Sequence, residues 1–162
     1  MPSPQRRDHL RRALAAWPFL IADPSEETVR LCDTALRHDS YVNERRPADP
    51  DADREDNERL EFLGDAVLEL MVRERLYLRS DLDEGGMTWE LQRLISNNAL
   101  ATGLRRAPLD LEGVLLTGEG QKELSDRMLA GAFEAMLGAL YLSEGLGPVS
   151  EVCRRLFLDP DI

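Results

Sequence analysis

Four acidic residues share one side of a predicted helix in the middle of the chain. The segment Asn57–Arg79 has helical periodicity, and Glu58, Glu61 and Asp65 lie within about 60° of one another around its axis, with Glu69 continuing the line. Like charges at this spacing weaken a helix by roughly a few tenths of a kcal/mol per pair. One interpretation is a solvated acidic face. The other is a carboxylate cluster that binds a hard divalent cation such as Mg²⁺, which prefers oxygen ligands.

A second predicted helix, Ser125–Glu144, carries a single carboxylate between small residues. Glu134 shares a narrow stripe with Gly131 and Gly138. Beside it runs an apolar stripe made of Leu129, Phe133, Met136, Leu137 and Leu140. An interior glycine costs about 0.5–1 kcal/mol relative to alanine, so we expect a close neighbour, such as another helix, to pack there. An acid on such a face is expected to bind a metal ion, to be protonated, or both.

The elements that position these acids are predicted to be helical throughout. The other expected helices are Gln5–Trp17, Ser25–Arg37, Thr88–Arg106 and Pro148–Leu156. Their N-caps are expected near Ser25, Thr88 and Ser125, and Gly145 is expected to end the helix before it. The apolar arc of Asn57–Arg79 is expected to contain Leu60, Leu63, Val67, Leu70 and Met71. No stretch shows sustained strand alternation, so the predicted fold class is all-α, in one compact domain.

Length and charge set the broad class. The chain has 162 residues, 20 basic and 31 acidic, with a net charge of −11 and a pI near 4.7, which by itself argues against a nucleic-acid partner. Its apolar runs are too short to span a membrane, and Pro18 interrupts the one stretch that faintly resembles an export signal. Cys32 and Cys153 are too far apart for a disulfide framework or a zinc knuckle. We expect a cytoplasmic protein with an exposed acidic loop at Arg45–Asp56.

Four segments, in order, resemble the motifs of the ribonuclease III endonucleases. Asn57–Leu68 (NERLEFLGDAVL) closely resembles the defining motif of that family. His38–Glu44 is similar to its T-H-x-S-Y-x-N-E segment, and Asp83–Thr88 (DEGGMT) is similar to its D-E-G-x-L/M-S/T turn. Leu129–Leu142 is similar to the family helix that carries an essential glutamate. The resemblance covers about residues 25–158 and implies the family's compact helical fold.

The resemblance also implies an activity and the residues that perform it. Glu61, Asp65 and Glu134 match the catalytic, metal-binding acids of the family. Glu84 matches a further acid near the metals, and Glu58 matches a supporting one. The implied reaction is Mg²⁺-dependent hydrolysis of phosphodiester bonds in double-stranded or structured RNA during RNA processing or maturation, with Mn²⁺ as a substitute. It leaves 5′-phosphate and 3′-hydroxyl ends.

The partners follow from the same resemblance. Phe62 matches an aromatic residue that inserts into the second subunit of a homodimer, and its place outside the apolar arc independently requires a partner surface. We expect residues 1–162 to form a single domain, without a double-stranded-RNA-binding domain and without a membrane. RNA affinity then comes from this domain and its dimer, or from a separate RNA-binding protein. Lys122, in a glycine-containing loop, is a candidate phosphate contact.

One departure from the family pattern leaves an alternative function open. Gly131 occupies a position where the family usually has aspartate. Asp126 is the nearest replacement, but it lies about 12 Å along the axis from Glu134 and roughly 80° around it, so we do not expect it to join the cluster. The alternative is a catalytically weakened or inert RNA-binding dimer, and a more remote one is an acidic protein scaffold. Retention of repelling carboxylates favours the enzyme, with weak, salt-sensitive RNA binding that depends on divalent ions.

Overall fold

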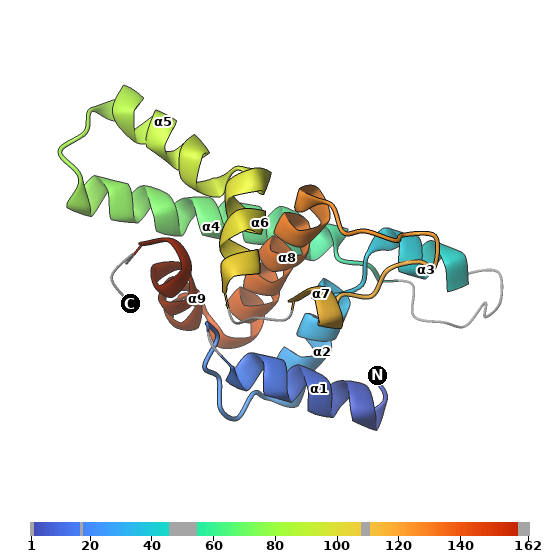
Figure 1. Ribbon diagram of the computed structural model, residues 1–162. Helices are drawn as coiled ribbons and strands as arrows, with labels where there is room; N and C mark the ends of the chain where they lie inside the picture. The colour runs from blue at the N-terminus through green and yellow to red at the C-terminus, as the bar shows by residue number, and fades with distance from the viewer. Residues whose placement is uncertain (1, 17, 46–54, 108–110, 159–162) are drawn as a thin grey trace.

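The computed structural model describes residues 2–16, 18–45, 55–107 and 111–158, and these residues form an all-α fold (Figure 1). The helices are α1 (Pro4–Ala15), α2 (Glu26–Ala35), α3 (Asp39–Arg45), α4 (Glu58–Arg79), α5 (Glu84–Ile95), α6 (Asn97–Arg106), α7 (Leu111–Val114), α8 (Asp126–Glu144) and α9 (Leu146–Cys153), followed by a π-helical turn at Arg154–Leu158. Over the described ranges, the extended pairing is limited to an isolated bridge between Arg37 and Leu116. The predicted fold class is therefore confirmed.

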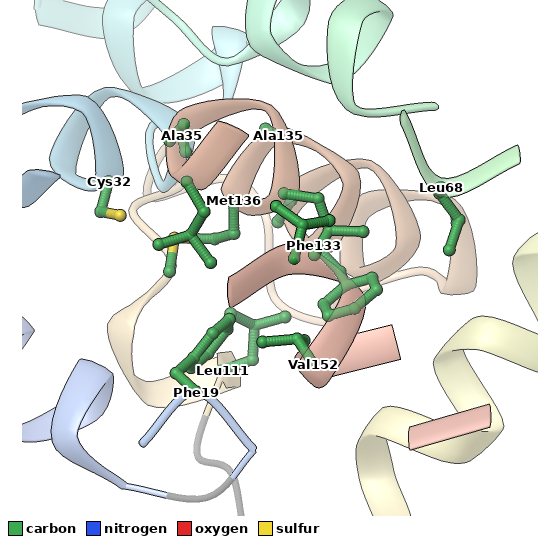
Figure 2. Packing of buried hydrophobic residues seen from close by; sticks show 14 of the residues in the cluster. Phe19, Cys32, Ala35, Leu68, Leu111, Phe133, Ala135, Met136 and Val152 are labelled. Carbon is green, nitrogen blue, oxygen red and sulfur yellow. The ribbon is translucent and has the colours of Figure 1, made fainter. Parts of the chain in front are cut away.

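Helix α8 is the centre of the molecule. Every residue from Met128 to Leu140 is buried, because α4, α2 and α6 pack around this helix. Figure 2 shows Phe133 and Met136 of α8 in one cluster with Cys32 of α2 and other apolar side chains. The predicted apolar stripe of α8 is confirmed, but the buried surface extends all the way around the helix. A helix that is apolar on all sides is typical of a core position.

Two glycines bring α4 and α8 into backbone contact. A Cβ atom at Gly64 would lie 1.7 Å from the carbonyl oxygen of Glu134, and one at Gly138 would lie 2.4 Å from the carbonyl oxygen of Leu60. No side chain fits at either position without moving a helix. The expectation that a helix packs closely against the glycine stripe is confirmed at Gly138.

The structure corrects two helix predictions and one core residue. The predicted helix Thr88–Arg106 is two helices, α5 and α6, which are separated at Ser96. Helix α5 starts earlier than predicted, because Asp83, and not Thr88, caps it by accepting a hydrogen bond from a backbone N–H of the first turn. Leu70 is half exposed and does not belong to the core.

Three other boundary predictions are confirmed, whereas the last predicted helix, Pro148–Leu156, begins two residues earlier, at Leu146, and changes to a π-helical turn after Cys153. Ser25 and Ser125 cap α2 and α8 through their side-chain oxygens, and Gly145 ends α8 with φ of 80°. The predicted helix end at Trp17 and most of the predicted acidic loop, residues 46–54, lie outside the described residues. Among the described helices, none combines the length and the apolar character that a membrane span requires.

Candidate active site

A cavity of about 780 Å³ lies where the first turns of α4 and α8 meet the junction of α5 and α6. Its lining includes the four acids predicted on one face of α4, namely Glu58, Glu61, Asp65 and Glu69. Glu134 lines it from α8. Both groups of acids that the sequence suggests therefore share one cavity, which a merely solvated face of α4 does not explain.

The central carboxylates of this cavity resist ionisation. Burial, together with the nearby charges of Asp65 and Glu61, raises the pKa of Glu134 to about 8. Burial also raises the pKa of Glu61, while the positive charge of Arg127 opposes that change. The pKa of Asp65 is raised by burial and by the charge of Glu69. A bound cation would relieve this mutual repulsion.

The chemistry of the donor groups fits a hard divalent cation. Glu61, Asp65 and Glu134 offer carboxylate oxygens, the ligands that Mg²⁺ and Mn²⁺ prefer. Over the described part of the chain, no three acidic, histidine or cysteine side chains lie close enough together to hold a metal ion as they stand. Mg²⁺ does not require three such ligands, because it usually binds through one or two carboxylates and keeps several waters. The residues present therefore suit a loosely held, hydrated ion.

Gly131 also lines the cavity and lies against Glu61. A Cβ atom at position 131 would be 2.7 Å from Oε2 of Glu61 and 2.8 Å from its Cδ. The Glu61 carboxylate therefore reaches across from α4 to the backbone of α8. It occupies the space that any side chain at position 131 would need.

Arg127 is a feature of the site that the sequence analysis missed. It is the second residue of α8, it is exposed, and it lines the cavity. It forms no ion pair with any described residue, although its charge acts on Glu61. Its spacing of four and seven residues from Gly131 and Glu134 places all three on one face of the helix, and this spacing could have revealed it.

His38 lies at the edge of the cavity with its ring already engaged. Its Nδ1 atom is 2.8 Å from Oγ of Ser40 and 2.8 Å from Oδ1 of Asp39. The ring is therefore held through its Nδ1 atom by two neighbours from its own segment.

The segment similar to T-H-x-S-Y-x-N-E holds a neighbouring loop in place. Oγ of Ser40 accepts a hydrogen bond from the backbone N–H of Gly118 at 3.1 Å, and Oε2 of Glu44 accepts one from the N–H of Glu119 at 2.7 Å. In Figure 1 this orange loop runs along α3 before it enters α8. Lys122 is exposed in the same loop and is not among the described residues that line the cavity.

Glu84 and Asp126 do not line the cavity. Glu84 is the first residue of α5, whose opposite end, Ile95, lines the cavity about 16 Å away along the helix. Its position within this chain gives no support to the predicted role as a metal ligand. Asp126 pairs with Arg105 instead of entering the cavity, as its distance from Glu134 along the helix had led us to expect.

Large apolar side chains are exposed next to the cavity. Phe62, which lines the cavity, is 84% exposed, and Trp89 of α5 is 68% exposed. Leu70, two turns after Phe62 on α4, is 50% exposed. Isolated exposed apolar residues are ordinary, but two aromatic rings and a leucine on the adjacent helices α4 and α5 indicate a surface that another molecule covers.

Comparison with known proteins places these features in a family. A family model described as Ribonuclease-III-like matches residues 29–160. The protein named Ribonuclease 3 from Oleidesulfovibrio alaskensis is 42% identical over 134 residues, which are 80% of this chain and 56% of that protein. Its counterpart from Onion yellows phytoplasma is 36% identical over 143 residues, which are 86% and 57% of the two chains. The chain thus spans about half the length of these curated relatives.

A solved structure agrees with this assignment. The nuclease domain of ribonuclease III from Campylobacter jejuni superimposes with a TM-score of 0.71 and 26% sequence identity. The match covers 91% of this chain and 92% of that one. The likeness therefore extends over nearly the whole described fold, including the helices that form the cavity.

Proposed function

The chain belongs to the ribonuclease III family, and on this basis we propose that it is a divalent-metal-dependent endoribonuclease that hydrolyses phosphodiester bonds in double-stranded or structured RNA. The observation that carries the proposal is the presence of Glu61, Asp65 and Glu134 in one cavity. Burial, together with the charges of Asp65 and Glu61, raises the pKa of Glu134 to about 8. A domain that only binds RNA has no physical reason to maintain such a cluster.

The three carboxylates have distinct tasks in this proposal. Glu61 and Asp65 present oxygens from α4, and Glu134 presents oxygens from α8, so that the ion would link the two helices. When bound, Mg²⁺ or Mn²⁺ supplies an activated water and stabilises charge on the leaving 3′ oxygen. Binding of the ion would require Glu134 to lose its proton to solvent, because its raised pKa of about 8 favours the protonated form at neutral pH. Glu58 and Glu69 lie on the same wall and add negative potential that attracts the ion.

An RNA duplex is the substrate class that this surface suits. Such duplexes are recognised through their shape, their 2′-hydroxyls and their phosphates more than through base sequence. Because the net charge of the chain is −11, RNA approaches an acidic molecule, and binding depends on the divalent ion and on a few arginines. Arg127 is placed to contact phosphate inside the cavity, whereas Lys122 would contact phosphate farther along the duplex.

We propose that the active form is a homodimer. Phe62, Leu70 and Trp89 supply an exposed apolar surface beside the cavity. The nuclease domain from Campylobacter jejuni has a region involved in dimer formation, which supports the same arrangement here. Cys32 and Cys153 are buried free thiols, which suits the proposed cytoplasmic location. A separate RNA-binding protein would add affinity for RNA.

The proposal is tested by incubating the purified protein with long double-stranded RNA, matched single-stranded RNA and double-stranded DNA. Each substrate is offered with Mg²⁺, with Mn²⁺ and with EDTA. We expect cleavage of double-stranded RNA with either ion and none in EDTA, with 5′-phosphate ends on the products. Absence of cleavage with both ions, or cleavage that persists in EDTA, would overturn the proposal. Binding to RNA without cleavage would favour the inert RNA-binding dimer.

A further inference from the structure

The glycines of α4 and α8 are not equivalent in what they contact. At Gly64 and Gly138, an added Cβ atom would collide with main-chain atoms of the opposite helix. At Gly131, the three nearest heavy atoms all belong to the side-chain carboxylate of Glu61, at 2.7, 2.8 and 3.1 Å. Gly64 and Gly138 therefore allow the helices to cross, whereas Gly131 makes room for a functional group.

A glycine at position 131 makes α8 less stable than an alanine would, so helix formation does not explain its presence. Glycine inside a helix is less stable than alanine by about 0.5–1 kcal/mol, and Gly131 lies well inside α8. Gly131 lines the cavity, and the three heavy atoms nearest to an alanine methyl group there would all belong to Glu61. The glycine is therefore best explained by what it does for Glu61.

We propose that Gly131 is a positioning residue for Glu61: it leaves a niche on α8 that receives the Glu61 carboxylate and holds it one helical turn before Glu134. This inference rests on the proposed metal-dependent function, because it assigns Glu61 to the ion. In the niche, Glu61 reaches the helix that carries Glu134, about 4.5 Å along its axis from that residue. The missing side chain at position 131 is thereby replaced by the carboxylate of another residue.

The surroundings of the niche agree with this role. The Glu61 side chain is only partly exposed to solvent in this position. Arg127, one turn before Gly131 on α8, acts on it with the opposite sign. Its charge therefore offsets part of the cost of placing Glu61 against α8.

The direct test is Gly131→Ala, with Gly120→Ala as a control. Gly120 is exposed in the loop before α8, and a Cβ atom there would meet no heavy atom within 4 Å outside its chain neighbours. Mn²⁺ and Mg²⁺ binding is measured by calorimetry without RNA, and the melting temperature is measured without metal. For Gly131→Ala we expect metal binding to weaken about tenfold with no fall in melting temperature, because alanine favours the helix. We expect Gly120→Ala to bind metal as the wild type does.

Two outcomes would overturn the inference while leaving the proposed function intact. In the first outcome, the wild type binds metal and cleaves RNA, and the Gly131→Ala variant binds metal as well as the wild type does. In the second outcome, Gly131→Ala loses metal binding and also has a lower melting temperature, which would indicate that Gly131 serves helix packing. A wild type that neither binds the ions nor cleaves RNA would overturn the proposed function, and the inference with it.

A second variant tests whether Gly131 acts through Glu61. Glu61→Asp keeps the carboxylate but shortens the side chain by one methylene, so it no longer fills the niche. In this background, Gly131→Ala should weaken metal binding much less than it does in the wild type. A full tenfold loss in both backgrounds would contradict a coupling between the two residues.

Discussion

Gly64 of α4 lies directly against the main-chain carbonyl of Glu134 of α8. A Cβ atom at position 64 would be 1.7 Å from that carbonyl oxygen, so only glycine fits. This contact fixes the point where the two helices cross. On α8 this point is Glu134, whose side chain enters the cavity, and on α4 it is followed directly by Asp65. The same few residues therefore determine both the packing of the core and the geometry of the candidate metal site.

Replacement of this glycine is expected to destabilise the protein severely. Gly64→Ala forces α4 and α8 apart at their closest approach, at a cost of about 3 kcal/mol or more in the free energy of unfolding. Gly120→Ala, which adds the same methyl group to an exposed loop residue, is expected to change that free energy by about 0.5 kcal/mol or less. Urea unfolding measures both. Equal stability of the two variants would contradict the close crossing.

Removal of the charge of a central carboxylate is expected to abolish most cleavage. Asp65→Asn and Glu134→Gln each lose an oxygen ligand, and the ion's stabilisation of the transition state is worth several kcal/mol, so the rate should fall by about a hundredfold or more. Glu74→Gln is the matched control, because Glu74 lies on α4 outside the cavity. Single-turnover cleavage of double-stranded RNA measures the effect. The prediction fails if Glu74→Gln is as slow as the other two variants.

The stability of the metal-free protein is expected to fall as the pH rises. The pKa of Glu134 is raised from 4.5 to about 8, so the folded state binds more protons than the unfolded state between these values. The free energy of unfolding therefore decreases from about pH 4.5 to pH 8, and burial of Glu61 and Asp65 acts in the same direction. Glu134→Gln should be less sensitive to pH over this range. A constant difference between the variant and the wild type at every pH would refute the assignment.

Arg127 is expected to contribute to RNA affinity through a phosphate. Arg127→Ala should weaken binding of catalytically inactive Glu134→Gln protein to double-stranded RNA several-fold, and should reduce the slope of log affinity against log salt by about one. Arg12→Ala, on the exposed face of α1, is the control and should alter neither quantity. Fluorescence anisotropy at several salt concentrations measures both. An unchanged salt slope in Arg127→Ala would exclude the phosphate contact.

The apolar surface beside the cavity is expected to hold the dimer together. Phe62→Ala and Trp89→Ala remove exposed aromatic rings, and buried aromatic anchors at interfaces are typically worth about 2 kcal/mol or more, so each should weaken dimerisation at least tenfold. Leu142→Ala, at the far end of α8 and 56% exposed, is the control. Sedimentation equilibrium gives the dissociation constants. A dimer unaffected by both aromatic substitutions would place the interface elsewhere.

The acids of the site were predictable because helical geometry is local. The spacing of Glu58, Glu61 and Asp65 places them on one face whatever surrounds the helix, and the single Glu134 between two glycines marks the facing helix. Arg127 was missed among the 20 basic residues of the chain, although its spacing from Gly131 and Glu134 places it on their face of α8. The cavity brings it beside the carboxylates.

The parts of the fold that were not predicted depend on local helix capping that the apolar pattern does not reveal and, at one residue, on tertiary packing. The apolar period continues through Ser96, so a single helix was expected, although Ser96 ends α5 and caps α6. Two glycines after Glu84 concealed the start of α5, which the side chain of Asp83 specifies. Leu70 fits the apolar arc of α4 by position, but the neighbouring helices leave it exposed.

The measurement that tests the account most directly is cleavage of long double-stranded RNA, with Mg²⁺ or Mn²⁺, by the wild type, by Glu134→Ala and by Gly131→Asp. The account predicts that the wild type cleaves, that Glu134→Ala does not, and that Gly131→Asp cleaves no faster than the wild type. The last result is expected because an aspartate Cβ would lie 2.7 Å from the Glu61 carboxylate and would displace it. The account would be contradicted if the wild type did not cleave and the Gly131→Asp variant did. That result would identify the protein as an inert member of the family, in which the aspartate restores a missing metal ligand.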